Sequence, residues 1–243
     1  WANNLEIIDY VNEGGTKTYY SNYTIYAYNS TYVGNVSRNI TLQQNIVNDV
    51  ITTSAGSFVD PSTQIISCKT LNSANSVYTL QNSITTIGSC LTIGANNITI
   101  NMNGYNITGD ANSAGDYGFD NSGSYSNLTI KNGYIYNFGA GIYSSGSSGN
   151  FTNLTISTIA SISFSSVYGI FIKGNNKYIT DFNISNISNL GIDGEAWGIG
   201  IKIASLNNII SNTFIDTIIG GTGIGRGTGI DVSGSSNNNL IYN

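Results

Sequence analysis

Histidine is absent from the 243-residue chain, and proline, methionine and cysteine are nearly so, with one, one and two residues. Without histidine the chain cannot build a Ser-His-Asp triad or a Cys-His pair, and it lacks the ligand of most zinc and iron sites. Carboxylate chemistry or Ca²⁺-assisted chemistry is what remains. The sequence predicts no cofactor.

Charge is also scarce, because Asp, Glu, Lys and Arg make up only 9% of the residues, against about 25% in ordinary soluble domains. The net charge is −5, and only Arg38 and Arg226 are arginines. No basic face is available to neutralise phosphates, so nucleic acid is not an expected partner. The 40% hydrophobic content can supply a sizeable core, and Asn, Ser, Thr and 29 Gly must solvate the surface.

Long apolar runs are missing as well, and no stretch of about 18 apolar residues predicts a membrane span. The sequence opens on Trp1, and its first ten residues lack the basic and apolar regions of a signal peptide. We therefore expect a mature, secreted protein, extracellular or on the cell surface. Cys68 and Cys90 are 22 residues apart, which is close to the length of the repeat described below. Outside the cell we expect them to form a disulfide rather than two buried thiols.

A glycine followed by an apolar residue recurs at steps of 23, 28, 31 and 29 residues. The pairs are Gly118-Phe119, Gly141-Ile142, Gly169-Ile170, Gly200-Ile201 and Gly229-Ile230. Short β-branched runs between them alternate with Gly, Ser and Asn clusters, and helical periodicity is absent from this part of the chain. A repeat of this size cannot bury its own apolar face, so it must stack on its neighbours. The pattern predicts an all-β parallel solenoid of six or seven coils over residues 67–243.

Alternation along the strands assigns side chains to the two faces of each coil. The apolar member of each pair points inward, and its successor points outward. The outward column is Asp120, Tyr143, Phe171, Lys202 and Asp231. The adjacent aromatics Tyr143 and Phe171 are either a platform for sugar stacking or a simple contact between neighbouring coils.

Asparagine followed by an aliphatic residue forms a second series about ten residues after most of the glycine pairs. Its members are Asn97, Asn127, Asn153, Asn208 and Asn239. We expect these amides to stack as one ladder and to be sterically hidden. Eleven Asn-x-Ser/Thr triplets occur, only slightly more than composition alone would produce. Outside the ladder, the candidate glycosylation sites are Asn22, Asn29, Asn35, Asn39, Asn106, Asn150, Asn183 and Asn186.

With "NNITINMNGYNITG", "SNLTIKNGYIYNFGAGIY" and "GIDVSGSSNNNLIYN", residues 68–243 resemble the right-handed parallel β-helix superfamily. This superfamily contains pectate lyases, polygalacturonases, tailspikes and surface proteins of archaea and bacteria. The resemblance implies a right-handed parallel β-helix and is nearly silent about activity. The Asn-Thr-Asp, Asp-Asp, Gly-His-Gly and Arg-Ile-Lys segments of polygalacturonase-like members do not occur here.

Residues 1–66 do not show the repeat, and "TYYSNYTIYAYNSTY" alternates like a half-exposed strand. We expect this segment to cap the solenoid or to supply a strand from Tyr19 to Tyr28 to a neighbouring molecule. At the other end, residues 237–243 contain neither charge nor proline. An open parallel edge of this kind favours head-to-tail association into a homopolymer. The alternative is that the chain is a fragment whose further C-terminal residues form a cap.

Three groups of residues are candidates for binding or catalysis. Asp110, Asp116 and Asp120 are either Ca²⁺ ligands or a solvated turn, because their spacing matches no EF-hand loop. Asp193, Glu195 and Trp197 are either a carboxylate site or an insertion loop, and Arg226 is a candidate contact for an acidic sugar. Since none of these groups combines a nucleophile, a base and an orienting residue, the chain is not expected to be an enzyme.

The leading hypothesis is a non-enzymatic extracellular structural protein, a subunit of a glycosylated filament or surface layer. One alternative is a β-helix polysaccharide lyase or hydrolase, for which acids and a basic residue should converge on one face. The other is a carbohydrate-binding adhesin, for which aromatic side chains should line a groove.

Overall fold

The computed structural model describes residues 63–161, 166–189, 197–221, 225–234 and 236–242, and, before them, the backbone of five strands. The chain divides into two compact units, Trp1–Asp60 and Pro61–Asn243. The first unit contains a hairpin of β1 (Tyr10–Glu13) and β2 (Thr16–Tyr19). It also contains an antiparallel sheet in the order β3 (Asn22–Tyr28), β4 (Tyr32–Asn39) and β5 (Ser54–Ala55). The Tyr-rich strand expected near Tyr19–Tyr28 therefore ends one hairpin and forms an edge strand of this sheet.

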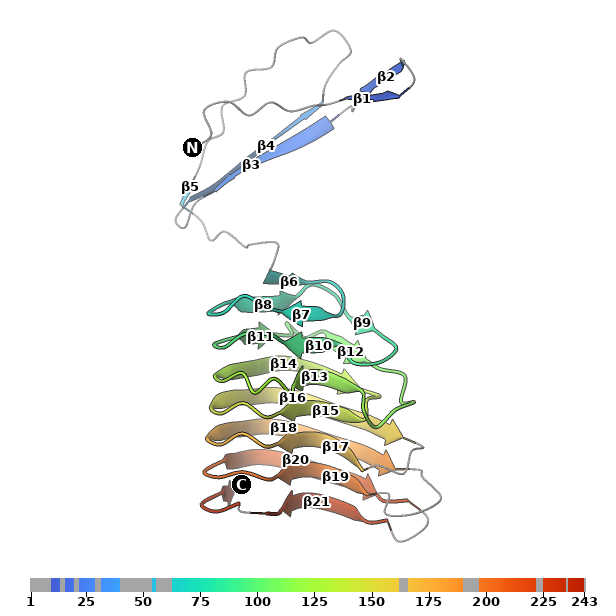
Figure 1. Cartoon of the computed structure of the whole chain (residues 1–243), viewed down its shortest axis with the longest axis vertical. Coiled ribbons are helices and arrows are strands. Elements are labelled where there is room, and N and C mark those ends of the chain that lie inside the picture. Colours follow the sequence, from blue (N-terminus) through green and yellow to red (C-terminus); the bar gives the residue numbers. More distant parts are fainter. Residues whose placement is uncertain are drawn as a thin grey trace. The chain divides into compact units, whose positions relative to one another are not determined.

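The second unit is a parallel β-helix, as the repeat predicted, and its coils stack along one axis (Figure 1). One face is a seven-stranded parallel sheet with one strand from each coil. Its strands are, in spatial order, β7 (Lys69–Leu71), β10 (Leu91–Ile93), β13 (Tyr117–Asn121), β15 (Ala140–Ser144), β17 (Val167–Ile172), β19 (Gly198–Ile203) and β21 (Gly227–Val232). The count of seven coils agrees with the repeat analysis.

The other face is a ten-stranded parallel sheet. Its main path is β6 (Gln64–Ile65), β8 (Val77–Leu80), β11 (Thr99–Asn101), β14 (Leu128–Tyr136), β16 (Gly149–Ser161), β18 (Lys177–Asn189), β20 (Ile209–Ile219) and β22 (Leu240–Tyr242). Off this path, β12 (Asn106–Thr108) pairs with β14 and with β9 (Ile84–Thr85). Strand β6 lies before residue 67, so the first strand of the solenoid falls within the segment that showed no repeat.

The register of the seven-stranded sheet places the apolar residue of each glycine pair in one inward column, as alternation predicted. Phe119, Ile142, Ile170 and Ile201 are fully buried in this column. The glycine before each of them also has a structural reason. A Cβ on Gly169 would lie 2.5 Å from the carbonyl oxygen of Gly200, and Gly118, Gly141 and Gly200 have equivalent contacts at 2.5–2.7 Å. The coils approach so closely here that only glycine fits.

Bends between the strands are made by residues with positive φ, a conformation that asparagine tolerates better than other non-glycine residues. One such column precedes the ten-stranded sheet in every coil, at φ of 56–59°. Its members are Asn75, Asn97, Asn127, Ser148, Asn176, Asn207 and Asn238. A second column, Asn132, Asn153, Asp181 and Asn212, bends the long strands themselves. The abundance of asparagine in this sequence therefore reflects the number of corners.

Candidate functional site

A disulfide joins the first two coils, as predicted. Cys68 immediately precedes β7 and Cys90 immediately precedes β10, and these strands pair with Leu91 opposite Lys69. The two cysteines are therefore opposite each other, with a Cα–Cα distance of 4.5 Å. This lies within the range that a disulfide can bridge, and the bond closes the coil between the two cysteines.

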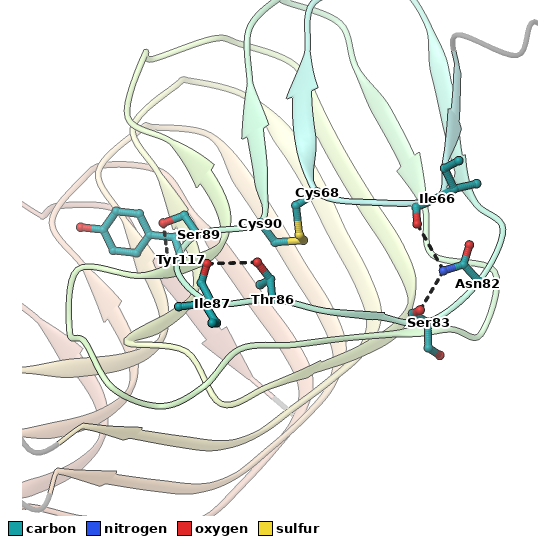
Figure 2. The surroundings of a disulfide bond; sticks show 9 residues. All are labelled: Ile66, Cys68, Asn82, Ser83, Thr86, Ile87, Ser89, Cys90 and Tyr117. Atoms are coloured by element: carbon teal, nitrogen blue, oxygen red, sulfur yellow. Dashed lines mark hydrogen bonds between the residues drawn. A yellow bond between two sulfur atoms is a disulfide. The ribbon is translucent and has the colours of Figure 1, made fainter.

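Hydrogen bonds hold the segment between the cysteines against the flanking coils (Figure 2). The Asn82 Nδ2 donates to the Ile66 carbonyl at 3.3 Å and to the Ser83 carbonyl at 2.8 Å. On the other side, the Ser89 Oγ accepts from the backbone N–H of Tyr117 at 2.9 Å. The disulfide thus belongs to a braced N-terminal coil rather than to a mobile loop tip.

The acidic residues proposed as Ca²⁺ ligands do not converge. Among the described residues, no three His, Cys, Asp or Glu side chains lie close enough together to hold a metal ion. Asp110 accepts hydrogen bonds from the side chain and backbone of Asn112, which lowers the pKa of its carboxyl. Burial, and then the charge of Asp110, raise the pKa of Asp116. Asp120 instead accepts from the Ser122 N–H on the outer face of β13. The three carboxylates therefore do not form a shared cation site.

The second acidic group cannot be assembled from the described residues, because Asp193 and Glu195 lie outside them. Trp197 is half-buried, and its Nε1 is a buried donor with no hydrogen-bond acceptor among the described residues. Arg226 is exposed between β20 and β21. These positions do not define a binding geometry.

Aromatic side chains do gather on the outer face of the seven-stranded sheet. Tyr117 and Tyr143 are stacked with their ring centroids 5.0 Å apart and an interplanar angle of 16°. Phe171 meets Tyr143 edge to face at 5.3 Å and Tyr168 at 4.8 Å. Tyr143 and Phe171 were predicted to be adjacent, and the register confirms this. The sequence analysis did not predict that Tyr117 and Tyr168 join this group. They lie in another column of the sheet, in which Ala140 is opposite Tyr117 on one side and Tyr168 on the other.

Lysine ammonium groups cover part of these rings. The Lys173 Nζ lies 5.4 Å from the Phe171 centroid and 5.7 Å from that of Tyr143, and the Lys202 Nζ lies 6.0 Å from that of Phe171. Lys202 also forms an ion pair of 2.9 Å with Asp231 in the next coil. A sugar stacks on an open ring face, whereas the faces of Tyr143 and Phe171 are already engaged. We call this group of aromatic and charged residues the aromatic face; it comprises Tyr117, Asp120, Tyr143, Tyr168, Phe171, Lys173, Lys202 and Asp231.

Asparagine side chains of the described solenoid bond between coils in three columns instead of the single ladder predicted. One of the three is the inward pair in which the Asn208 Nδ2 donates to the Asn239 Oδ1 at 2.9 Å. The other two are longer ladders. In the first, the Asn97 Nδ2 donates to Asn75 at 2.8 Å and the Asn127 Nδ2 donates to Asn97 at 2.7 Å. Asn153 does not continue this ladder, because the residue opposite Asn127 is Ser148. It belongs to the second ladder, in which its Nδ2 donates to Asn132 at 3.0 Å. The prediction that these asparagines are sterically hidden was also wrong, since Asn97, Asn127 and Asn153 are exposed.

The misassigned ladder has a physical cause. Positive-φ residues and the inward residues that follow them are consecutive, and both are often asparagine. Asn208 and Asn239 belong to the inward column that contains Lys177, and not to the column of Asn97. Asn208 is fully buried. The pattern Asn-aliphatic therefore combined two different columns.

A buried lysine, Lys177, is the feature that the sequence analysis missed. Its side chain is fully buried, and its Nζ donates to the Ser148 carbonyl at 2.7 Å and lies 5.3 Å from the Phe151 ring centroid. Burial lowers the pKa of Lys177 from the usual 10.5 to about 8. Gly149, opposite Lys177 in the inward column, makes room for it, because a Cβ there would lie 3.1 Å from the Nζ. Alternation was the available signal, since Lys177 is two residues before the inward Ile179.

All seven glycosylation triplets of the described solenoid lie on the ten-stranded sheet or in the turn leading into it. They are Asn97, Asn106, Asn127, Asn150, Asn153, Asn183 and Asn186. Asn150, Asn183 and Asn186 are exposed, and Asn106 is half-buried. Asn22, Asn35 and Asn39 lie on β3 and β4, where only the backbone is described, and Asn29 lies outside the described residues. The outer face of the seven-stranded sheet carries no such triplet in its described strands.

Comparison of the chain with family models, with curated proteins and with solved structures gives no match. In the described part of the chain, no helix has the length and apolarity needed to cross a membrane. The disulfide and this finding are compatible with an extracellular protein.

Proposed function

We propose that this chain is a non-enzymatic extracellular structural protein, a subunit of a glycosylated filament or surface layer. The observation that carries the proposal is the uninterrupted stack of seven coils. In it, glycine contacts fix the spacing of the coils, and asparagine ladders and a disulfide join them. Such a solenoid is a stiff spacer whose length grows with the number of coils. We further propose that it is a divergent relative of the surface proteins in the right-handed β-helix superfamily.

Glycans on the ten-stranded sheet form the second part of the proposal. Asn150, Asn183 and Asn186 are exposed in triplets that an extracellular glycosylation pathway accepts. Because the chain has few charges, a sugar coat is a means of keeping a long solenoid hydrated. Mass spectrometry of the native protein should find sugar on these asparagines.

Association through the C-terminal coil forms the third part. Val232 and Ile241 occupy inward columns whose members one coil earlier, Ile203 and Ile210, are buried. In the last coil both are 44% exposed, since no further coil of the described chain covers them. At the other end, β6 lies outside β8, with Ile65 opposite the buried Leu80. A second copy of the chain that stacks on β21 and β22 would bury this apolar surface and pair the open backbone edge.

Replacement of Ile241 by lysine tests the end contact. We expect the wild-type protein to sediment as species whose size grows with concentration, and Ile241→Lys to abolish that growth, because it places a charge in the inward column. Leu240→Lys is the matched control, since Leu240 points to the outer face and is already 53% exposed. It should leave the association intact.

Two results would contradict the proposal. A wild-type protein that stays monomeric at high concentration would show that something other than a second copy covers the last coil. Release of unsaturated or reducing sugar ends from an acidic polysaccharide by the purified chain would show that the protein is an enzyme.

A further inference from the structure

The two outer faces of the solenoid differ in a way that the proposed end contact does not explain. Every glycosylation triplet of the described solenoid is on the side of the ten-stranded sheet. The aromatic face lies instead on the side of the seven-stranded sheet, whose strands follow one another along the axis (Figure 1). A sugar coat would therefore leave the aromatic face free to contact a partner.

Residues on the aromatic face are arranged in a self-complementary order. The register places Asp120, Tyr143, Phe171 and Lys202 side by side on four successive coils, β13, β15, β17 and β19. An acid and a base thus flank two aromatic residues. If the order is reversed, Asp120 takes the place of Lys202, and Tyr143 takes the place of Phe171.

We propose that a second copy of this chain packs on the aromatic face, with the two solenoids antiparallel. A two-fold axis in the interface, between the Tyr143 and Phe171 rows, reverses the order of the coils. It brings Asp120 of each molecule opposite Lys202 of the other and sets Tyr143 against Phe171. The contact is isologous and lateral, so it is independent of the end contact and joins filaments side by side.

Charge and ring geometry favour this partner over a polysaccharide. The face carries Asp120 and Asp231 as well as Lys173 and Lys202, a mixed set that suits a surface with the same mixture and not a uniformly acidic chain. The faces of Tyr143 and Phe171 are engaged by neighbouring rings and ammonium groups, which leaves their edges for contact. Ring edges pack against the side chains of an opposing sheet at about 10 Å between sheets.

Zero-length cross-linking of the native chain tests the proposal without a substitution. Within one molecule, Asp120 and Lys202 are three coils apart, about 14 Å at a coil spacing of about 4.8 Å, too far for a direct amide bond between their side chains. We expect an Asp120–Lys202 cross-link that forms only between chains, confirmed by mixing isotopically light and heavy protein. The Lys202–Asp231 pair is within bonding distance in one molecule and is the internal positive control.

Charge reversal gives the second test, carried out in the Ile241→Lys background so that end association does not interfere. Sedimentation equilibrium should show a dimer whose dissociation constant rises about tenfold or more with Asp120→Lys or with Lys202→Asp. The triple variant Asp120→Lys/Lys202→Asp/Asp231→Lys should restore the dimer, because it rebuilds both opposing pairs and also the ion pair between residues 202 and 231 within each molecule. Lys131→Asp, on the outer face of the ten-stranded sheet, is the matched control and should leave the dimer unchanged.

The outcomes separate this inference from the proposed function. A lateral dimer in Ile241→Lys supports the aromatic face even if the wild type forms no filament, and filaments without the cross-link retain the end contact alone. Absence of the cross-link together with a monomer in Ile241→Lys would overturn the lateral contact. So would a dimer that tolerates both single reversals, or a monomer that binds polygalacturonate through the aromatic face.

Discussion

Substitution of Lys177 by methionine should stabilise this protein at neutral pH. Methionine fills nearly the same space without a charge. The side chain of Lys177 is fully buried, and its ammonium group contacts the Ser148 carbonyl and the Phe151 ring. Lowering the pKa from 10.5 to about 8 corresponds to roughly 3 kcal/mol of cost for the protonated lysine at pH 7. Loss of the charged hydrogen bond to the Ser148 carbonyl offsets about 2 kcal/mol of the gain. We expect a net stabilisation of about 1 kcal/mol at pH 7.

The pH dependence follows from the sign of the shift. Since the folded pKa lies below the unfolded one, the unfolded chain binds more protons between about pH 8 and 10.5, and the stability of the wild type rises with pH in that window. Below about pH 8 the cost is fully present. The stability of Lys177→Met relative to the wild type should therefore fall by roughly 2 kcal/mol between pH 7 and pH 10.

Denaturant unfolding of both proteins at pH 7 and pH 10, followed by circular dichroism, measures this difference. Both proteins contain the same tyrosines, so the tyrosine contribution to the pH dependence cancels in the difference. Lys131→Met on the outer face is the control and should show no such change. If the difference between the wild type and Lys177→Met were the same at both pH values, the reasoning from burial would be refuted.

Two further predictions concern the contacts between coils. Gly169→Ala should cost about 2 kcal/mol or more in unfolding free energy, because its Cβ would lie 2.5 Å from the Gly200 carbonyl oxygen. Gly229→Ala is the matched control and should be nearly neutral in a monomer, because the atom nearest to its Cβ would be 3.8 Å away. Equal damage from both would contradict the packing argument. Replacing Cys68 and Cys90 by serine should cost about 3 kcal/mol by the chain-entropy estimate, visible as a lower melting temperature, and an unchanged melting temperature would show that the coil is already ordered without the bond.

Sequence periodicity by itself determined the solenoid. The glycine pairs recur once per coil from β13 to β21. Because strand side chains alternate, the pattern also identified the inward column with Ile142 and Ile170 and the adjacency of Tyr143 and Phe171. The disulfide followed from the same repeat, since two cysteines about one coil apart lie opposite each other.

The register at the corners was decided only by the tertiary structure. A residue with positive φ shifts the alternation by one position, and the turns differ in length from coil to coil, so Asn153 and Asn127 lie in different ladders. The same shift, at Asn176, turns Lys177 inward opposite Gly149. In β13 the residue pairing skips Gly118, and Tyr117 stacks on Tyr143. These two pairs of neighbours are 28 and 26 residues apart in the chain. Their contact depends on the summed length of every turn between them, which no local pattern records.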